Sequence, residues 1–152
     1  HMNVDELDAL FNKRSGMMGM TGHGDLREVH KLVEAGDENA KLALDVYVHR
    51  IVGYIGNYTA QMGGVDVITF TAGVGENDDI VRKMVCEKLA PFGVKLDLEK
   101  NATRSKEPRI ISTPDSSVII AVIPTNEELA IARKSAAIAE EGKDSYGNVF
   151  AK

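Results

Sequence analysis

A run of apolar, β-branched residues that ends at a glycine-containing turn constrains the fold of this chain most strongly. Residues 65–70 have the character of a buried strand, residues 71–77 read Thr-Ala-Gly-Val-Gly-Glu-Asn, and apolar residues recur at helical spacing from Asp78 onward. The apolar positions of the strand are Val65, Val67, Ile68 and Phe70. This order predicts a strand, a tight turn and a helix, an arrangement in which the turn can contact a phosphate or a nucleotide.

The two glycines of the turn, Gly73 and Gly75, lack a Cβ. The backbone can therefore adopt positive φ, and a flat or anionic ligand can lie against bare peptide. The same spacing also suits a structural turn that binds nothing. A dinucleotide-binding fingerprint would require glycine or alanine at position 78, where this chain has aspartate. The turn alone leaves both interpretations open.

Three strings of residues, in this order and spacing, resemble the acetate kinase family. They are residues 70–77 (Phe-Thr-Ala-Gly-Val-Gly-Glu-Asn), residues 111–116 (Ile-Ser-Thr-Pro-Asp-Ser) and residues 123–129 (Ile-Pro-Thr-Asn-Glu-Glu-Leu). The resemblance extends from about Leu7 to about Ala137. It implies an α/β fold, a portion of a ribonuclease-H-like C-terminal domain of the actin-like ATPase type. Such a domain has a mixed sheet, flanking helices and a long helix before the turn that contacts adenosine.

The resemblance also implies a division of the chain. Kinases of this family are well over twice as long, so we expect this chain to be an excised C-terminal part of their C-terminal domain. His1-Met2 is interpreted as a cloning scar. Residues 3–139 are expected to form one nucleotide-binding domain, and the polar residues 140–152 a disordered tail.

Composition restricts the partners and the compartment. With 152 residues, 43% of them hydrophobic, the chain can bury one core. A net charge of −5 argues against nucleic-acid and anionic-membrane partners. The longest apolar run, residues 118–123, is too short to cross a bilayer. Cys86 is the only cysteine and is expected to be a packed thiol, which suits a reducing compartment. We expect a cytoplasmic protein.

Caps and apolar spacing predict the remaining elements. Helices are expected over residues 5–13, from Asp25 to Gly36, over about 25 residues from Asp37 to Gly63, after the glycine turn, and from Thr125. Short strands are expected at residues 94–96, 110–112 and 118–123, a loop at 16–24 and an exposed polar segment at 97–107. The expected inward positions are Leu42, Val46, Ile51, Ile55 and Met62 on the long helix, and Leu129, Ile131 and Ala132 on the last.

The resemblance implies a nucleotide site formed by two segments. Its residues are Asp25, Leu26 and Arg27 in one segment, and Gly73, Val74, Gly75, Glu76 and Asn77 in the other. Arg27 is suited to stacking on the base or hydrogen-bonding to it and to the sugar. Structural alternatives stay open, because Asp25, followed by Glu28, is a good helix N-cap, Arg27 could be solvated, and Asn77 could cap the next helix.

A metal-associated acid is implied near the last helix. Thr125 and Glu128 fit a capping box, which leaves Glu127 without a structural role. The family has a Mg²⁺-associated glutamate here, so the resemblance implies that Glu127 is that residue. Water and nucleotide phosphates would complete the magnesium shell. The alternative is an acid that only stabilises the helix dipole.

The activity implied by the resemblance is reversible transfer of the γ-phosphoryl group of ATP to acetate, giving acetyl phosphate and ADP, by a homodimer that meets through the C-terminal domain. The family's phosphoryl-transfer groups come from other segments. We therefore expect no catalytic residue in this chain and no turnover by it alone. Two alternatives stay open: a propionate kinase, because the acyl pocket lies outside this chain, and a non-catalytic nucleotide-binding or dimerisation module.

Overall fold

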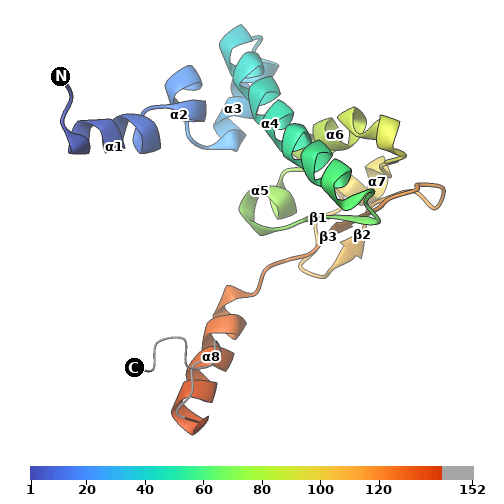
Figure 1. The fold of residues 1–152 in the computed structure, drawn as a ribbon. Coiled ribbons are helices and arrows are strands. Elements are labelled where there is room, and N and C mark those ends of the chain that lie inside the picture. The colour runs from blue at the N-terminus through green and yellow to red at the C-terminus, as the bar shows by residue number, and fades with distance from the viewer. Residues whose placement is uncertain (142–152) are drawn as a thin grey trace.

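The computed structural model describes residues 1–141, so the expected tail lies, except for its first two residues, outside the described part of the chain. The structure is of mixed α/β type (Figure 1). Its helices are α1 (Val4–Lys13), α2 (Gly16–Thr21), α3 (Leu26–Glu34), α4 (Glu38–Met62), α5 (Ala72–Asn77), α6 (Asp79–Lys88), the 3-10 helix η1 (Ala90–Phe92), α7 (Leu98–Ala102) and α8 (Glu127–Glu141). Its strands are β1 (Val67–Phe70), β2 (Arg109–Ile110) and β3 (Ile119–Val122).

The strands form a three-stranded mixed sheet in the order β1-β3-β2. β1 runs parallel to β3, with Val67 opposite Ile119, and β2 runs antiparallel to β3, with Ile110 opposite Ala121. The parallel pairing requires a long crossover, which contains α5, α6 and α7. The predicted mixed sheet with flanking helices is thereby confirmed. The expected strand at residues 94–96 is wrong, because only Leu96 makes an isolated bridge, to Ser112.

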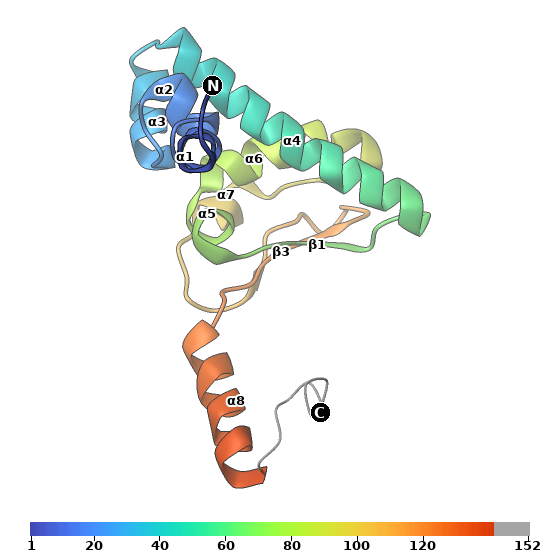
Figure 2. The same ribbon diagram turned by 60° about the vertical axis from the view of Figure 1, so that its left-hand side comes forward.

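One apolar core lies between the sheet and the helices α4 and α6, which cover the same face of the sheet (Figures 1 and 2). Its buried members are Leu44, Val48, Phe70, Val81, Val85, Cys86, Leu89, Val94, Ile111, Val118, Ile120 and Val122. The buried thiol of Cys86 confirms the expected packed cysteine.

The opposite face of the sheet carries exposed apolar side chains. Val67 and Ile119 are paired in register and are 48% and 45% exposed, and Ile110 on β2 is exposed as well. Side chains alternate between the two faces of a strand, so these three residues share a face. The expectation that β1 is a buried strand is therefore wrong: β1 is an edge strand, and only one of its faces packs on the core.

The long helix α4 has the predicted length of 25 residues. The side chain of Asp37 accepts a hydrogen bond from the backbone N–H of Ala40, and Gly63 ends the helix with φ 74°. The predicted inward face is wrong in its first half, because Leu42 and Val46 are exposed while Leu44 and Val48 are buried. Apolar residues at every second position do not select one helix face, so packing on α3 and α6 decides which side is buried.

Residues 16–24 are not the expected loop. Residues 16–21 form α2, which packs against α4 and ends at Gly22 in the left-handed conformation, with φ 74°. Methionine is a good helix former, and Met17, Met18 and Met20 outweigh the two glycines of α2. The expected polar segment at 97–107 is also partly wrong, because it contains α7, on which Asn101 is buried.

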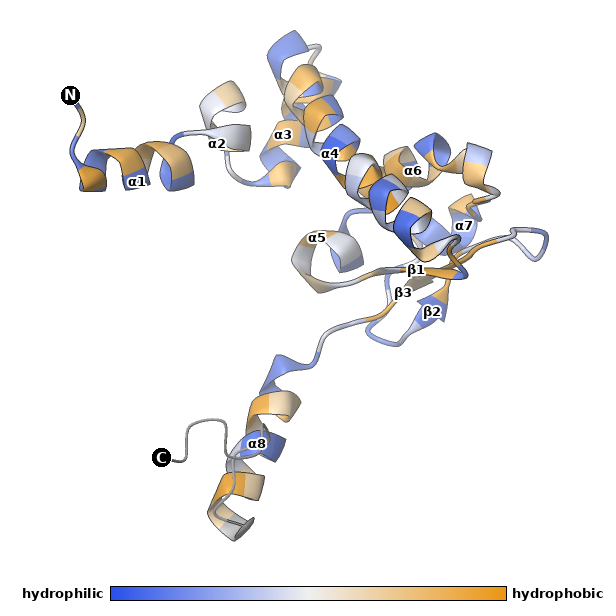
Figure 3. Ribbon diagram, in the orientation of Figure 1, coloured by the Kyte–Doolittle hydropathy of each residue, from blue (hydrophilic) through white to orange (hydrophobic). Residues whose placement is uncertain are grey.

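The last helix, α8, projects away from the sheet (Figures 1 and 2), and its apolar residues are visible along it in Figure 3. Leu129 and Ile131 are exposed, so the expectation that they face inward is wrong. Asn126, rather than Thr125, caps α8, because its side-chain oxygen accepts a hydrogen bond from the N–H of Leu129. The expected capping box with Glu128 is therefore wrong.

Candidate functional site

A cleft of about 900 Å³ lies between the start of α3 and the segment that joins α5 to α6. Six of the eight residues expected at a nucleotide site line it: Asp25, Leu26, Arg27, Gly73, Val74 and Asn77. The other two, Gly75 and Glu76, do not line the cleft and lie in the same helix, α5. Two segments nearly fifty residues apart in sequence are thus brought to one cavity.

The glycine segment is a helix of six residues rather than an open turn. Among the described residues, the only non-glycine residue with positive φ is Ala72, at 57°, so the expectation that Gly73 and Gly75 supply positive φ is wrong. Gly75 is needed for packing, because a Cβ there would lie 3.1 Å from the carbonyl carbon of Phe70. A Cβ at Gly73 would meet no atom within 4 Å and would extend into open space. The chain's own packing therefore does not explain a glycine at position 73.

Asn77 does not cap the helix that follows it. Its side-chain amide donates to the carbonyl oxygen of Gly73 at 2.9 Å. Asp78 is the N-cap of α6, and its Oδ1 accepts a hydrogen bond from the N–H of Val81 at 2.9 Å. The alternative in which Asn77 is the cap is therefore wrong.

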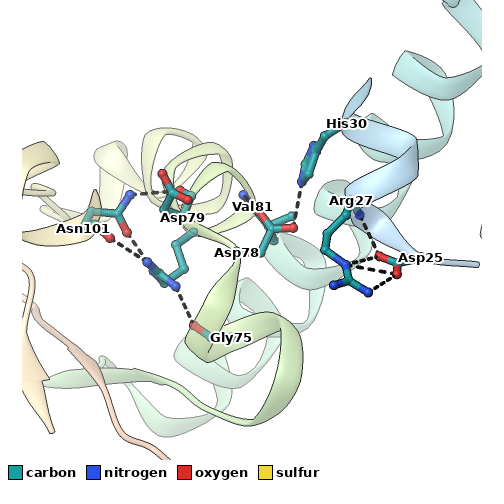
Figure 4. Close-up of polar contacts among 9 residues, drawn as sticks. Asp25, Arg27, His30, Gly75, Asp78, Asp79, Val81 and Asn101 are labelled. Atoms are coloured by element: carbon teal, nitrogen blue, oxygen red, sulfur yellow. Dashed lines mark hydrogen bonds and ion pairs between the residues drawn. The ribbon is translucent and has the colours of Figure 1, made fainter. Parts of the chain in front are cut away.

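Asp25 and Arg27 form a pair at the rim of the cleft (Figure 4). The Asp25 carboxylate caps α3 by accepting from the N–H of Arg27, and it also accepts from the guanidinium Nε and Nη2 of that residue. These hydrogen bonds lower the pKa of Asp25 to about 2 and raise the pKa of Arg27. Glu28 takes no part in the cap, because it pairs with Lys31. The Arg27 side chain remains 85% exposed.

His30 and Asp78 connect the two walls of the cleft (Figure 4). His30 Nε2 lies 2.7 Å from Asp78 Oδ2, and both side chains are largely buried, with 14% and 12% exposed. Tyr47 also lines the cleft, and burial together with the nearby Asp78 carboxylate raises its pKa. Sequence reasoning missed His30 and Tyr47, because no local pattern relates them to the glycine segment.

Arg104 contributes a second arginine to the cleft. It follows α7, in the segment that the sequence predicts to be merely exposed and polar. Arg104 was therefore not among the residues that the sequence predicts at the site. Together with Arg27 it gives the cleft two guanidinium groups, which are suited to anionic or aromatic ligand groups.

Arg82 is buried and hydrogen-bonded to the backbone of the glycine segment. Its Nη1 donates to the carbonyl oxygens of Gly75 and Glu76, each at 3.0 Å. Its Nε and Nη2 donate to the side-chain and backbone oxygens of Asn101, at 2.7 and 2.6 Å. Burial lowers the pKa of Arg82. Neither Arg82 nor Asn101 was a sequence candidate.

Glu76 and Glu127 lie outside the lining of the cleft. The Glu76 carboxylate accepts hydrogen bonds from the N–H of Thr125 at 2.8 Å and from its hydroxyl at 3.2 Å. Glu127 is the first residue of α8, two positions beyond this contact, and is exposed. Within residues 1–141, no three His, Cys, Asp or Glu side chains gather closely enough to hold a metal ion.

Sequence comparison identifies the family. The model of the acetokinase family matches residues 1–133. This chain belongs to the acetokinase family. Acetate kinase from Leifsonia xyli is 54% identical over 134 residues, which cover 88% of this chain and 34% of that protein. The chain thus spans about a third of the length of the curated relatives that it matches.

Solved structures named acetate kinase and propionate kinase contain the fold of this chain. Acetate kinase from Porphyromonas gingivalis superposes with a TM-score of 0.82 at 39% identity, over 91% of this chain and 35% of that one. Propionate kinase from Francisella tularensis superposes with a TM-score of 0.78, also at 39% identity, over 87% of this chain and 33% of that one. The fold is therefore that of the acetate kinases, of the actin-like ATPase type, as the resemblance implied. Between residues 1 and 141, none of the helices is both long and apolar enough to span a membrane.

Proposed function

We propose that this chain is the nucleotide-binding C-terminal part of an acetate kinase, which transfers phosphoryl reversibly between ATP and acetate to give acetyl phosphate and ADP. One observation carries the proposal: six residues that the family resemblance assigns to the nucleotide, from two distant segments, line a single cleft of about 900 Å³. That volume is within the range usual for small-molecule sites. We place the parent enzyme in the cytoplasm, where ATP and acetyl phosphate are exchanged.

The conformation at Gly73 supports contact between a ligand and the backbone. Gly73 has neither positive φ nor a neighbour within 4 Å of its Cβ position, and it lines the cleft. A side chain there would extend into the open space of the cleft. Glycine is expected where a ligand lies directly on the peptide.

Magnesium would be held mainly by the nucleotide. Glu127 carries one exposed carboxylate at the start of α8, and no protein cluster within residues 1–141 supplies further ligands. This donor set suits Mg²⁺, which keeps several waters and binds one or two carboxylates together with substrate phosphates. When bound, the ion would neutralise charge on the transferring phosphoryl group. Glu127 would be the residue of this chain that holds the ion, through its carboxylate.

Acetate is the preferred acceptor in this proposal. The curated relatives at 49–54% identity are named acetate kinases, and this supports the preference. Among the solved structures, the propionate kinase and the acetate kinase from Porphyromonas gingivalis are both 39% identical. The likeness to the propionate kinase keeps propionate as the second candidate. Steady-state kinetics with acetate and propionate, on a protein that contains this chain within the full length of its relatives, separates the two. A higher kcat/KM for propionate would overturn the preference.

The nucleotide site is tested by NMR titration of this chain with adenosine and with Mg-ATP. Because the cleft offers mainly one purine-binding wall, both ligands should bind with a Kd on the order of 1 mM. The largest shifts should occur in α5 and near Arg27. Shifts centred elsewhere would contradict the proposal, and they would favour a non-catalytic or dimerisation module.

A matched pair of variants sharpens this test. Gly73→Val should abolish adenosine binding while the domain stays folded, because the new side chain enters the cleft. Gly53→Val, at an exposed glycine of α4 with open space around its Cβ position, should leave binding unchanged. Glu127→Ala should also leave adenosine binding unchanged. A Gly73→Val variant that binds as the parent does would show that α5 has only a structural role.

We also propose that this chain alone does not turn over acetate and ATP, and that it self-associates. The described residues offer a nucleotide wall and one metal-side acid, whereas phosphoryl transfer needs groups positioned on both sides of the reacting atoms. Exposed apolar residues on α1, α8 and the open face of the sheet support a homodimer. Persistent turnover after repurification would overturn the first statement, and a monomer mass by light scattering at all concentrations would overturn the second.

A further inference from the structure

The described part of the chain buries a cation that has no acidic hydrogen-bond partner. Arg82 on α6 is 2% exposed, and its five-proton guanidinium donates only to neutral oxygens. Two of these belong to the Asn101 side chain and backbone, and two are the carbonyls of Gly75 and Glu76. A buried charge is costly unless every donor is satisfied. This arrangement indicates that Arg82 holds the neighbouring backbone in a fixed position.

The two carbonyls that Arg82 binds are at the C-terminal end of α5. The last carbonyls of a helix have no partner inside the helix and need one from elsewhere. Arg82 Nη1 donates a hydrogen bond to the carbonyl oxygens of both Gly75 and Glu76, at 3.0 Å each. Arg82 therefore supports the end of a six-residue helix, which is too short to be stable by itself.

Asn101 fixes Arg82 in turn. The side-chain oxygen and the backbone carbonyl of Asn101 accept hydrogen bonds from Nε and Nη2 of Arg82. The side-chain amide of Asn101 donates to the carbonyl of Asp79 at 2.9 Å. Asn101 is 3% exposed. Three helices, α5, α6 and α7, are thereby joined through one guanidinium.

Other residues of the same short helix line the cleft. Gly73, Val74 and Asn77 line the cleft, whereas Arg82 does not. We propose that Arg82 is a positioning residue for the nucleotide, which holds α5 at the orientation in which its bare backbone meets the ligand. This inference rests on the proposed nucleotide-binding function. Its test contains a measurement that does not need the ligand.

The test compares Arg82→Lys with Arg50→Lys on the exposed face of α4. Lysine keeps the charge of Arg82 but cannot donate in four fixed directions. In Arg82→Lys we expect amide hydrogen exchange in α5 to accelerate at least about tenfold while exchange in α4 stays unchanged. We expect the Kd for ATP to rise about tenfold. Arg50→Lys should match the parent in both measurements.

The outcomes test the positioning role of Arg82 and the proposed nucleotide binding separately. Parent-like exchange in α5 and a parent-like Kd in Arg82→Lys would overturn the positioning role. Exchange that accelerates equally in α4 and α5 would also overturn it, because Arg82 would then support the whole domain. If the parent shows no shifts in α5 with ATP, the proposed function fails, while exchange in α5 still decides whether Arg82 holds this helix.

Asn101→Ala is the second variant, and it decides the matter if Arg82→Lys does not fold. It removes the side-chain partner of Nε but keeps both bonds from Nη1 to α5. We expect a smaller acceleration of exchange, confined to α5 and its neighbour α7, and a smaller rise in Kd. Parent-like values for α5 and for ATP would overturn the inference.

Discussion

His30 Nε2 and Asp78 Oδ2 lie 2.7 Å apart and join α3 to the first residue before α6. Asp78 serves two helices at once, because its other carboxylate oxygen caps α6 through the N–H of Val81. The two walls of the cleft, one built on α3 and one on α5 and α6, therefore share a single carboxylate.

Replacing His30 should lower the stability of the domain. In His30→Ala the largely buried Asp78 carboxylate loses one hydrogen-bond partner, so we expect the free energy of unfolding to fall by about 1–2 kcal/mol. His49→Ala, at an exposed position on α4, should change it by less than about 0.5 kcal/mol. Urea denaturation, monitored by tyrosine fluorescence, measures the free energy of unfolding of both variants. Equal effects of the two substitutions would show that the His30 contact contributes nothing to the stability of the domain.

The Asp25 and Arg27 pair predicts a pH dependence at low pH. The hydrogen bonds from Arg27 hold the pKa of Asp25 at about 2 in the folded chain, whereas an unfolded chain has a pKa of about 4. Because the folded-state pKa is the lower one, the stability contributed by the pair is present above about pH 4 and is lost as the pH falls toward 2.

An NMR titration of the Asp25 carboxyl carbon checks this directly. The parent should titrate with a midpoint near 2, and Arg27→Met should move the midpoint up toward the ordinary aspartate value. Arg50→Met on α4 should leave it unchanged. A parent midpoint near 4 would contradict the pairing.

Cys86 should be unreactive in the folded chain. Burial raises the pKa of its thiol to about 12, and the thiolate is the reactive form. Alkylation by iodoacetamide, followed by mass spectrometry, should therefore be slow in native buffer near neutral pH and fast in concentrated urea. Rapid labelling without denaturant would mean that α6 opens readily from the core.

The Glu76 side chain should protect the segment between β3 and α8 from proteolysis. In Glu76→Ala, Thr125 loses both of its hydrogen bonds to the carboxylate, so the segment between β3 and α8 becomes easier to cleave. Limited proteolysis should cut residues 123–126 faster in this variant than in the parent. Glu87→Ala, which removes only an exposed partner of Lys83, is the control. Equal cleavage rates in the two variants would contradict a tethering role for Glu76.

Local signals in the sequence were sufficient for much of the fold. A helix cap involves residues within three or four positions, so Asp37 and Gly63 correctly mark the ends of α4, and Asp25 correctly marks the start of α3. Nearby residues alone did not determine which of two neighbouring residues caps α8. Thr125 and Asn126 are both suitable caps, and the carboxylate of Glu76, 49 residues away, engages the first and leaves the second to cap α8.

The candidate site was predictable only where the family resemblance names residues. Asp25, Arg27 and Gly73, which the resemblance assigns to a nucleotide site, line one cleft, and their role there stays a prediction. His30 and Arg82 were not anticipated, because their partners are 48 and 19 positions away and no periodicity relates such pairs. The conformation of α5 was also misjudged, since positive φ occurs at Ala72 rather than at either glycine. A glycine can be present for packing or for ligand access as well as for its backbone freedom.

The exposed helix α8 has a consequence for how the folding of this chain should be measured. It contributes fifteen helical residues, yet Leu129, Ile131 and Ile138 remain exposed and add nothing to the core between α4, α6 and the sheet. A helix of that length is only marginally stable in water. Ellipticity should therefore decline gradually on heating before the core side chains lose their fixed environment, and a free energy fitted to ellipticity alone would average two separate processes.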